Sequence, residues 1–308
     1  MNNKRYTVED WMTKGKMGRH ETFTPRYGWL KKGYDAVSEN GNIFKVDNAI
    51  ERLGVGKNMV RSMRFWCQAF NLIEPGNNNS MKATDLGDRL LADDGWDPFL
   101  EDIASLWLLH WQLFIPPIET ISWPLAFNNC NLWSFEVKQL GQIIYNAAQK
   151  YSTFDKIKST TFEKDASCII RMYTASAEIG TETECPFSQL QILQKANEAK
   201  TVYFNMTAKQ SLPPSIFAAA CFSYADSYIG PDQVMISLHQ LAYGMNSPGV
   251  AFKVSESDVG NYLNEATKTN EGFSLVNVLG NYELHLKKPP GVLFMETLEE
   301  YYRRRDDK

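Results

Sequence analysis

The clearest pattern in the sequence is an amphipathic helix expected from Lys57 to Asn71. At 100° per residue, Lys57, Arg61 and Arg64 fall within a narrow arc on one side of this helix. The opposite side carries large apolar residues: Met59, Met63, Trp66 and Phe70. The apolar side predicts a core contact, and the three cations predict a surface suited to phosphates, with Asn58 at its edge. A solvated helix face has the same pattern, so both interpretations stay open.

The residues on either side of this helix predict a winged helix-turn-helix. The expected elements are a helix over 28–37, a helix over 48–53, the cationic helix, a hairpin of 72–74 and 81–84, and a helix over 85–91. Gly54 and Gly56 provide a sharp turn, and Asp47 and Thr84 are the expected N-caps of the helices that follow them. Helix, helix, turn, helix and hairpin is the order of elements in that DNA-binding fold.

The rest of the chain predicts further helices and a second hairpin. A strongly apolar helix is expected over 96–114, ended by Pro116 and Pro117. More helices are expected over 135–151, 162–174, 189–196, 216–228, 233–242, 254–266 and 299–307. Residues 273–287 alternate in polarity, which predicts a hairpin and a second winged-helix-like unit. The fold class is therefore mainly α, with a polar lead-in (1–16), a winged helix-turn-helix (17–92), a helical middle domain (93–230) and a C-terminal winged-helix-like domain (231–308).

Charge is distributed unevenly along the chain. Between residues 14 and 64 there are 11 Lys and Arg against 5 Asp and Glu, a local charge of +6, while the whole chain carries −4. The remainder therefore carries about −10. This asymmetry favours an anionic partner, such as double-stranded DNA, bound at the N-terminal end. With 44% apolar and 13% aromatic residues, the chain also has ample material for a core.

Cysteine usage and apolar runs predict a cytoplasmic protein without a membrane partner. The five cysteines are odd in number, widely spaced and contain no C-x-x-C pair, which favours a reducing compartment. Residues 1–11 have no apolar signal-peptide region, and the run from 103 to 118 is short and interrupted by His, Gln and Pro. No coiled coil is visible, so the oligomeric state stays open.

Two groups of residues are candidates for catalytic chemistry. The first is an acidic cluster two turns before His110: Asp93, Asp94, Asp97, Glu101 and Asp102. Magnesium needs only one or two carboxylates together with water and phosphate, but acids at a helix start are also a routine response to the helix dipole. The second is His20-Glu21 near Arg26, a base and a carboxylate beside a cation, or equally a capping or exposed segment.

Several enzyme classes lack their motifs in this sequence. There is no nucleophile elbow, no G-x-x-x-x-G-K-[ST] phosphate loop, no G-x-G-x-x-G and no Cys/His zinc spacing. Gly54-Val55-Gly56-Lys57 lacks the preceding strand and the spacing of a phosphate loop. These absences count against serine hydrolases, P-loop ATPases, dinucleotide-binding enzymes and zinc enzymes.

Long sequence blocks resemble the prokaryotic domain-of-unknown-function family DUF4007. The strongest blocks are GRHETF (18–23) with RY (26–27), WLKKGYD (29–35), LGVGKNMV (53–60), LED (100–102) and LWLLHW (106–111). Weaker matches are KD (164–165), RMY (171–173), CP (185–186) and SPG (247–249). The resemblance therefore extends over nearly the whole chain, and its most specific blocks lie in the N-terminal third.

The resemblance implies a function in bacterial defence. Members are similar to the B component of the single-strand DNA phosphorothioation (Ssp) system, which acts beside a cysteine desulfurase, an ATPase and a sulfotransferring reductase-like protein. It implies a Mg²⁺-dependent nickase that opens one DNA strand so that sulfur can replace a phosphate oxygen.

The resemblance, together with the chemistry of the side chains, implies roles for individual residues. Magnesium would be held by Glu101 and Asp102 with Asp94, and His20 with Glu21 would act in catalysis, His20 as general base. The DNA-binding residues would be Arg19, Arg26, Lys31, Lys32, Lys57, Asn58, Arg61 and Arg64. The competing hypotheses are a non-catalytic DNA-binding adaptor that recruits the modification proteins, or a transcriptional regulator, for which a dimer helix is not visible.

Overall fold

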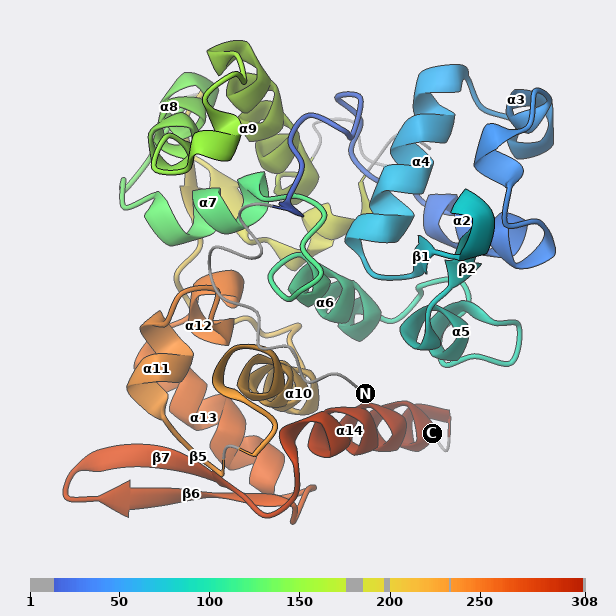
Figure 1. The fold of residues 1–308 in the computed structure, drawn as a ribbon. Helices are drawn as coiled ribbons and strands as arrows, with labels where there is room; N and C mark the ends of the chain where they lie inside the picture. The colour runs from blue at the N-terminus through green and yellow to red at the C-terminus, as the bar shows by residue number, and fades with distance from the viewer. Residues whose placement is uncertain (1–13, 176–184, 197–199, 233, 307–308) are drawn as a thin grey trace.

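The computed structural model describes residues 14–175, 185–196, 200–232 and 234–306, and helices predominate, as expected for a mainly α protein (Figure 1). The first group of elements is α2(Trp29–Glu39), η1(Ile43–Lys45), α3(Ala49–Leu53), α4(Lys57–Ala69), β1(Ile73–Pro75), η2(Asn77–Asn79), β2(Met81–Ala83) and α5(Asp85–Leu91). The second is α6(Ile103–Gln112), α7(Ser122–Asn129), α8(Val137–Ala148), η3(Ser152–Phe154), α9(Ser159–Tyr173), η4(Pro186–Leu190), β3(Leu193–Lys195) and β4(Val202–Phe204). The third is α10(Pro214–Tyr224), η5(Ala225–Ile229), β5(Met235–Ser237), α11(Leu238–Tyr243), α12(Pro248–Phe252), α13(Glu256–Thr267), β6(Phe273–Val278), β7(Asn281–Leu286) and α14(Pro290–Asp306).

The N-terminal elements follow the expected order of helices, turn and hairpin. Gly54 ends α3 in the left-handed conformation at φ 64°, and α4 starts three residues later. β1 and β2 pair antiparallel with Glu74 opposite Lys82, and the Thr84 side chain caps α5 at the Gly87 amide. Gly33 lets α2 approach α4, because an added Cβ would lie 2.5 Å from Cys67 Sγ. The helices and the hairpin are confirmed, whereas the assignment of a winged helix-turn-helix stays a prediction.

Three local predictions were wrong. Asn48, not Asp47, precedes α3, and neither residue provides a side-chain cap. Residues 189–196 are not a helix: Gln191 adopts φ 50°, which ends the short helix η4, and β3 then pairs with β4. The apolar helix starts at Ile103 rather than Trp96, since the Asp97 carboxylate binds the amides of residues 101 and 102 and fixes a loop there.

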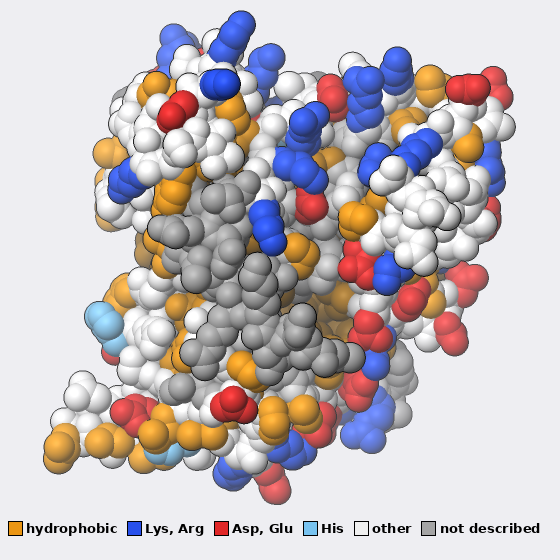
Figure 2. Space-filling view, viewed as in Figure 1, with side chains coloured by type: hydrophobic (Ala, Val, Ile, Leu, Met, Phe, Trp, Pro, Cys, Tyr) orange, Lys and Arg blue, Asp and Glu red, His pale blue; other side chains and the backbone are white. Residues whose placement is uncertain are grey.

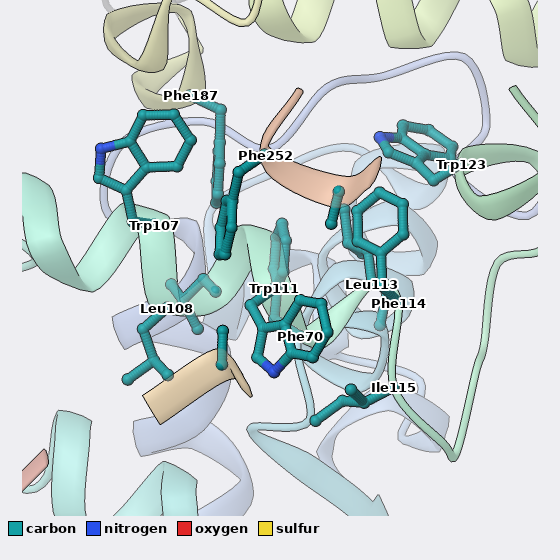
Figure 3. Packing of buried hydrophobic residues seen from close by; sticks show 14 of the residues in the cluster. Phe70, Trp107, Leu108, Trp111, Leu113, Phe114, Ile115, Trp123, Phe187 and Phe252 are labelled. Atoms are coloured by element: carbon teal, nitrogen blue, oxygen red, sulfur yellow. The ribbon is translucent and has the colours of Figure 1, made fainter. Parts of the chain in front are cut away.

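The central feature of the core is α6, which is buried on every side from Ala104 to Gln112. A helix that is apolar all round must be covered by other elements on all its faces. Figure 3 shows Trp107 and Trp111 of this helix near Phe252 of α12. His110 reaches Tyr173 of α9 and the carbonyl of Ala251. One helix thus joins elements from the middle and the end of the chain.

The C-terminal elements form a three-stranded sheet packed beside helices. Its strand order is β5–β7–β6, both pairs are antiparallel, and the β6–β7 hairpin projects from the molecule (Figure 1). The predicted hairpin is confirmed. The helix expected from residue 233 begins at Leu238 because residues 235–237 pair with β7, and the terminal helix begins at Pro290 rather than Glu299.

One hydrophobic cluster extends across all the predicted domain boundaries. It contains Trp66 of α4, Trp107 of α6 and Leu263 of α13. The division at residues 92 and 230 stays a prediction, while the lead-in 1–16 lies largely outside the described residues. Across the parts of the chain that the structure describes, none of the helices has the length and apolar character needed to span a membrane.

His110 is a buried histidine with a defined tautomer. Its Nε2 lies 2.9 Å from the Ala251 carbonyl, which can only accept, so Nε2 carries the proton. Nδ1 therefore accepts from the Tyr173 hydroxyl at 2.7 Å. Burial lowers the pKa of His110 from 6.5 to about 3. Both ring nitrogens of His110 are thus bound within the protein.

The burial of His110 predicts that the free energy of unfolding falls at acid pH. The unfolded chain takes up a proton at His110 near pH 6.5, but the folded protein does so only near pH 3, so this group lowers the free energy of unfolding as the pH falls through that window. The loss is about 1.4 kcal/mol per pH unit. His110→Gln keeps a donor and an acceptor, and its unfolding free energy, measured by urea denaturation, should fall less steeply between pH 6 and 4. His239→Gln, at an exposed position, is the control, and equal slopes for His110→Gln and the parent protein would contradict the prediction.

Candidate nucleic-acid interface

The N-terminal half of α4 carries an exposed cationic face. Lys57, Asn58 and Arg61 are exposed, and Val60 and Met63 on the other side are buried. Within the described residues, Lys57 has no hydrogen bond or ion pair, and Arg61 has only a 3.8 Å contact with Glu21. Two of the three predicted cations are therefore available to an anionic partner.

Arg64, the third cation of the predicted face, is half-buried toward the β1–β2 hairpin. Its Nη2 lies 3.5 Å from the Met81 sulfur, a weak acceptor, and its buried Nε has no acceptor among the described residues. Buried donors are normally satisfied, so this guanidinium retains unused hydrogen-bonding capacity. An anion bound between α4 and the hairpin would supply the missing acceptors.

The segment from Lys14 to Gly28 runs between α4 and α9 (Figure 1). Trp66 of α4 donates to the Phe23 carbonyl at 3.0 Å, and Arg171 of α9 donates to the Thr22 carbonyl at 2.5 Å. Arg19 of this segment is exposed. The segment therefore joins the two helices and adds a cation between them.

Cations continue from α4 across this segment onto α9. Lys164 and Arg171, seven residues apart, lie on one edge of α9 and are exposed. Figure 2 shows Lys and Arg side chains gathered over the upper part of this face. We call the set Arg19, Lys57, Arg61, Lys164 and Arg171 the cationic surface. Its α9 part was not predicted from the sequence, because no sequence pattern indicates that α9 lies on the other side of this segment from α4.

A buried carboxylate fixes the segment between the two helices. Asp165 of α9 is fully buried and accepts hydrogen bonds from the Gly18 amide (3.1 and 3.2 Å), His20 Nε2 (2.8 Å) and Ser122 Oγ (2.5 Å). A buried carboxylate is stable only when donors surround it in this way. Asp165 thereby holds α7, α9 and the segment in one arrangement.

His20 is enclosed by this arrangement. Its side chain is 1% exposed, and its ring lies about 6 Å from the rings of Phe65, Trp66 and Trp123. Nε2 binds Asp165, and Nδ1 accepts from the Thr22 amide at 3.1 Å. With both nitrogens in use and no exposure, the geometry favours a positioning role over the predicted general base. Glu21, by contrast, faces Arg61 and is partly exposed.

The predicted metal acids have separate structural environments. Asp102 is the N-cap of α6: its Oδ1 accepts from the Ala104 amide at 2.9 Å and its Oδ2 from the Tyr301 hydroxyl at 3.1 Å. Arg305 of α14 lies 3.7 Å from it. Glu101 and Asp94 are exposed. Within the described residues, no group of three or more His, Cys, Asp or Glu could hold a metal ion. Asp102 is thus already bound within the protein, and the assignment of Glu101, Asp102 and Asp94 as magnesium ligands stays a prediction. No local sequence pattern indicates that α14 occupies this position.

The other predicted cations line a cleft that the α4 cations do not reach. Arg26, Lys31 and Lys32 border a cleft of about 440 Å³. Lys31 bonds to Asp35 (2.8 Å) and Asp93 (2.7 Å); burial alone would lower its pKa, but these two carboxylates outweigh burial and raise it. Lys31 is thus paired with two carboxylates, and Arg26 and Lys32 are the other two predicted cations that line the cleft.

Comparison with known proteins shows which family and which solved structures this chain is similar to. The family model described as "Protein of unknown function (DUF4007)" matches residues 17–302. The chain is also similar to the solved structure described as "Magnesium ion-bound SspB crystal structure", with 32% identity, a TM-score of 0.87 and coverage of 95% of this chain and 90% of that chain. A second, "SspB crystal structure", has 32% identity, a TM-score of 0.86 and the same coverage. A search of curated proteins finds no match.

The range matched by the family model includes the cationic surface, the buried hydrogen bonds of Asp165 and the contact between α6 and α14. The chain belongs to the DUF4007 family.

Proposed function

We propose that this protein binds double-stranded DNA through the cationic surface and nicks one strand as a component of an Ssp-type DNA sulfur-modification system. The observation that carries the proposal is the cationic surface itself. Its cations come from α4, α9 and the segment between them, and most have no acidic partner within the described residues. The likeness to SspB supports the Ssp context.

The arrangement of α4 suits contact with a duplex. Lys57 and Asn58 occupy the first turn of the helix, where exposed side chains can reach phosphates and base edges. Lys and Arg contacts with phosphates release counterions, so binding of this kind weakens steeply with salt. Asn58 is the one amide on this turn that can pair with a base edge. The proposed interface therefore contacts mainly the DNA backbone.

Nicking and its magnesium dependence form the finer part of the proposal. One SspB structure is described as magnesium-bound, which supports testing this metal. In this chain, the carboxylate of Asp102 caps α6 and contacts α14, so we assign magnesium no ligand and derive no catalytic step through it. His20 is assigned the role of positioning the segment that carries Arg19.

A non-catalytic adaptor is the second candidate function. Both Asp102 and His20 were predicted to act in catalysis, but both form hydrogen bonds with neighbouring groups of the protein. These hydrogen bonds favour the adaptor. An adaptor would use the same cationic surface for DNA and would bring the other modification proteins to it. The two candidates differ in strand cleavage.

Charge reversal on α4 tests DNA binding. Lys57→Glu combined with Arg61→Glu should weaken duplex binding at least tenfold and lower the slope of log affinity against log salt by about two, because two phosphate contacts are lost. Both side chains are exposed, so the melting temperature should stay unchanged. Lys268→Glu with Lys288→Glu changes the net charge equally at exposed C-terminal positions and is the control. Unchanged affinity in the folded α4 variant would refute the interface.

A supercoiled-plasmid assay tests nicking. The protein should convert supercoiled plasmid to the open circle with Mg²⁺ and leave it supercoiled with EDTA, and an intact plasmid under both conditions would favour the adaptor.

The same assay distinguishes the two roles of His20. His20→Gln should retain at least a third of the nicking rate, since a glutamine amide can still donate to Asp165. A folded His20→Gln variant that binds duplex normally but no longer nicks would restore His20 as general base.

A further inference from the structure

The cleft beside α2 has exposed aromatic side chains as well as cations. It lies between α2, the end of α3 and the loop before α6, and its volume of about 440 Å³ is within the range of roughly 300–1,000 Å³ found for sites that bind small organic groups. Its wall includes the cations Arg26 and Arg52 and the aromatic residues Tyr27 and Phe99. None of the exposed α4 cations belongs to this wall, so the cleft is distinct from the cationic surface.

Two aromatic rings at the cleft are open to solvent. Tyr27 is 50% exposed and Phe99 is 72% exposed. An exposed phenylalanine makes no contribution to the core, and Phe99 is absent from the hydrophobic cluster. Tyr27 accepts a hydrogen bond from the Gln189 side chain, which orients its ring. The cleft thus presents two flat apolar surfaces that a planar ring could cover.

The loop that carries Phe99 is held in place by hydrogen bonds. Buried Asp97 accepts from the amides of residues 101 and 102, each at 3.0 Å, and from Ser105 Oγ at 2.6 Å. Leu100 adopts φ 55°, and its amide donates to the Asp97 carbonyl. Asp97 therefore fixes this loop, which places Phe99 at the cleft in the absence of a ligand.

The cations at the cleft are positioned for phosphate. The Arg26 guanidinium lies 5.7 Å from the Phe23 ring and 5.3 Å from the Trp29 ring, and among the described residues it has no hydrogen-bond acceptor or ion-pair partner. Arg52 has one long contact, 3.6 Å to exposed Glu39. The unused guanidinium donors of Arg26 suit a phosphodiester oxygen.

We propose that this cleft binds single-stranded DNA, with a base stacked on Tyr27 or Phe99 and the adjoining phosphates on Arg26 and Arg52. Stacked aromatic rings beside cations are the general way in which proteins hold unpaired nucleotides. Bases within a duplex are already stacked and cannot reach these rings, so the aromatic part of the cleft selects unpaired strands. The proposal rests on the proposed DNA-binding function and extends it to a second form of DNA.

Fluorescence anisotropy of the full chain with three labelled probes tests the cleft. The probes are a dT 12-mer, a 12-residue abasic strand with the same phosphates, and a 20-base-pair duplex. Tyr27→Ala with Phe99→Ala should weaken dT binding at least tenfold, as expected for losing base stacking, and leave duplex affinity within twofold. Phe99→Ala alone breaks no hydrogen bond found in the described residues, and should still weaken dT binding about fivefold or more. Tyr243→Ala removes a ring that is 57% exposed on α11 and serves as the control.

The probes separate failure of this inference from failure of the proposed function. If the parent protein binds the abasic strand as tightly as dT, or if both cleft variants bind dT as the parent does, the cleft does not bind bases and the inference is overturned. If the duplex is not bound at all, the proposed function fails, whereas a loss of dT binding in the cleft variants would still support the cleft.

Discussion

The carboxylate of Asp165 is the constraint on which the candidate interface depends. It is fully buried and is compensated by donors from α7 and from the segment before α2. Because an unpaired buried carboxylate is very unfavourable, these donors cannot leave separately, and the segment is fixed between α9 and α4. The positions of Arg19 and Glu21 in this segment, and the contact of Arg171 with the Thr22 carbonyl, therefore depend on the hydrogen bonds of Asp165.

Other buried polar groups also hold separate segments of the chain together. Asp97 holds the loop before α6, and His110 joins α6 to α9 and α12 through two hydrogen bonds. Each group satisfies backbone or side-chain donors that would otherwise be buried without partners. Residues that look catalytic by type are here used to assemble a fold whose central helix is apolar on every face. Burial, rather than residue type, separates these groups from the exposed ones that can contact a ligand.

The two cationic features suit different forms of DNA for physical reasons. The cationic surface is spread over two helices and is poor in exposed rings, which suits the regular phosphates of a duplex. The cleft has two exposed aromatic side chains beside its cations, which suits unpaired bases. Under the two proposals, the protein would bind duplex at one face and a separated strand at another, which would hold DNA around a nick.

The sequence by itself determined the amphipathic helix at 57–69, the glycine turn before it, the β1–β2 and β6–β7 hairpins and the Thr84 cap, because these depend on residues close together in the chain. Motif blocks also determined the family. The tertiary structure decided which polar residues are accessible: it buried His20 beside Asp165, 145 residues away, and placed Tyr301 of α14 on Asp102. It also placed α4 and α9 on the two sides of the segment before α2. Contacts between segments so far apart depend on how the helices cover α6, and no local pattern encodes that packing.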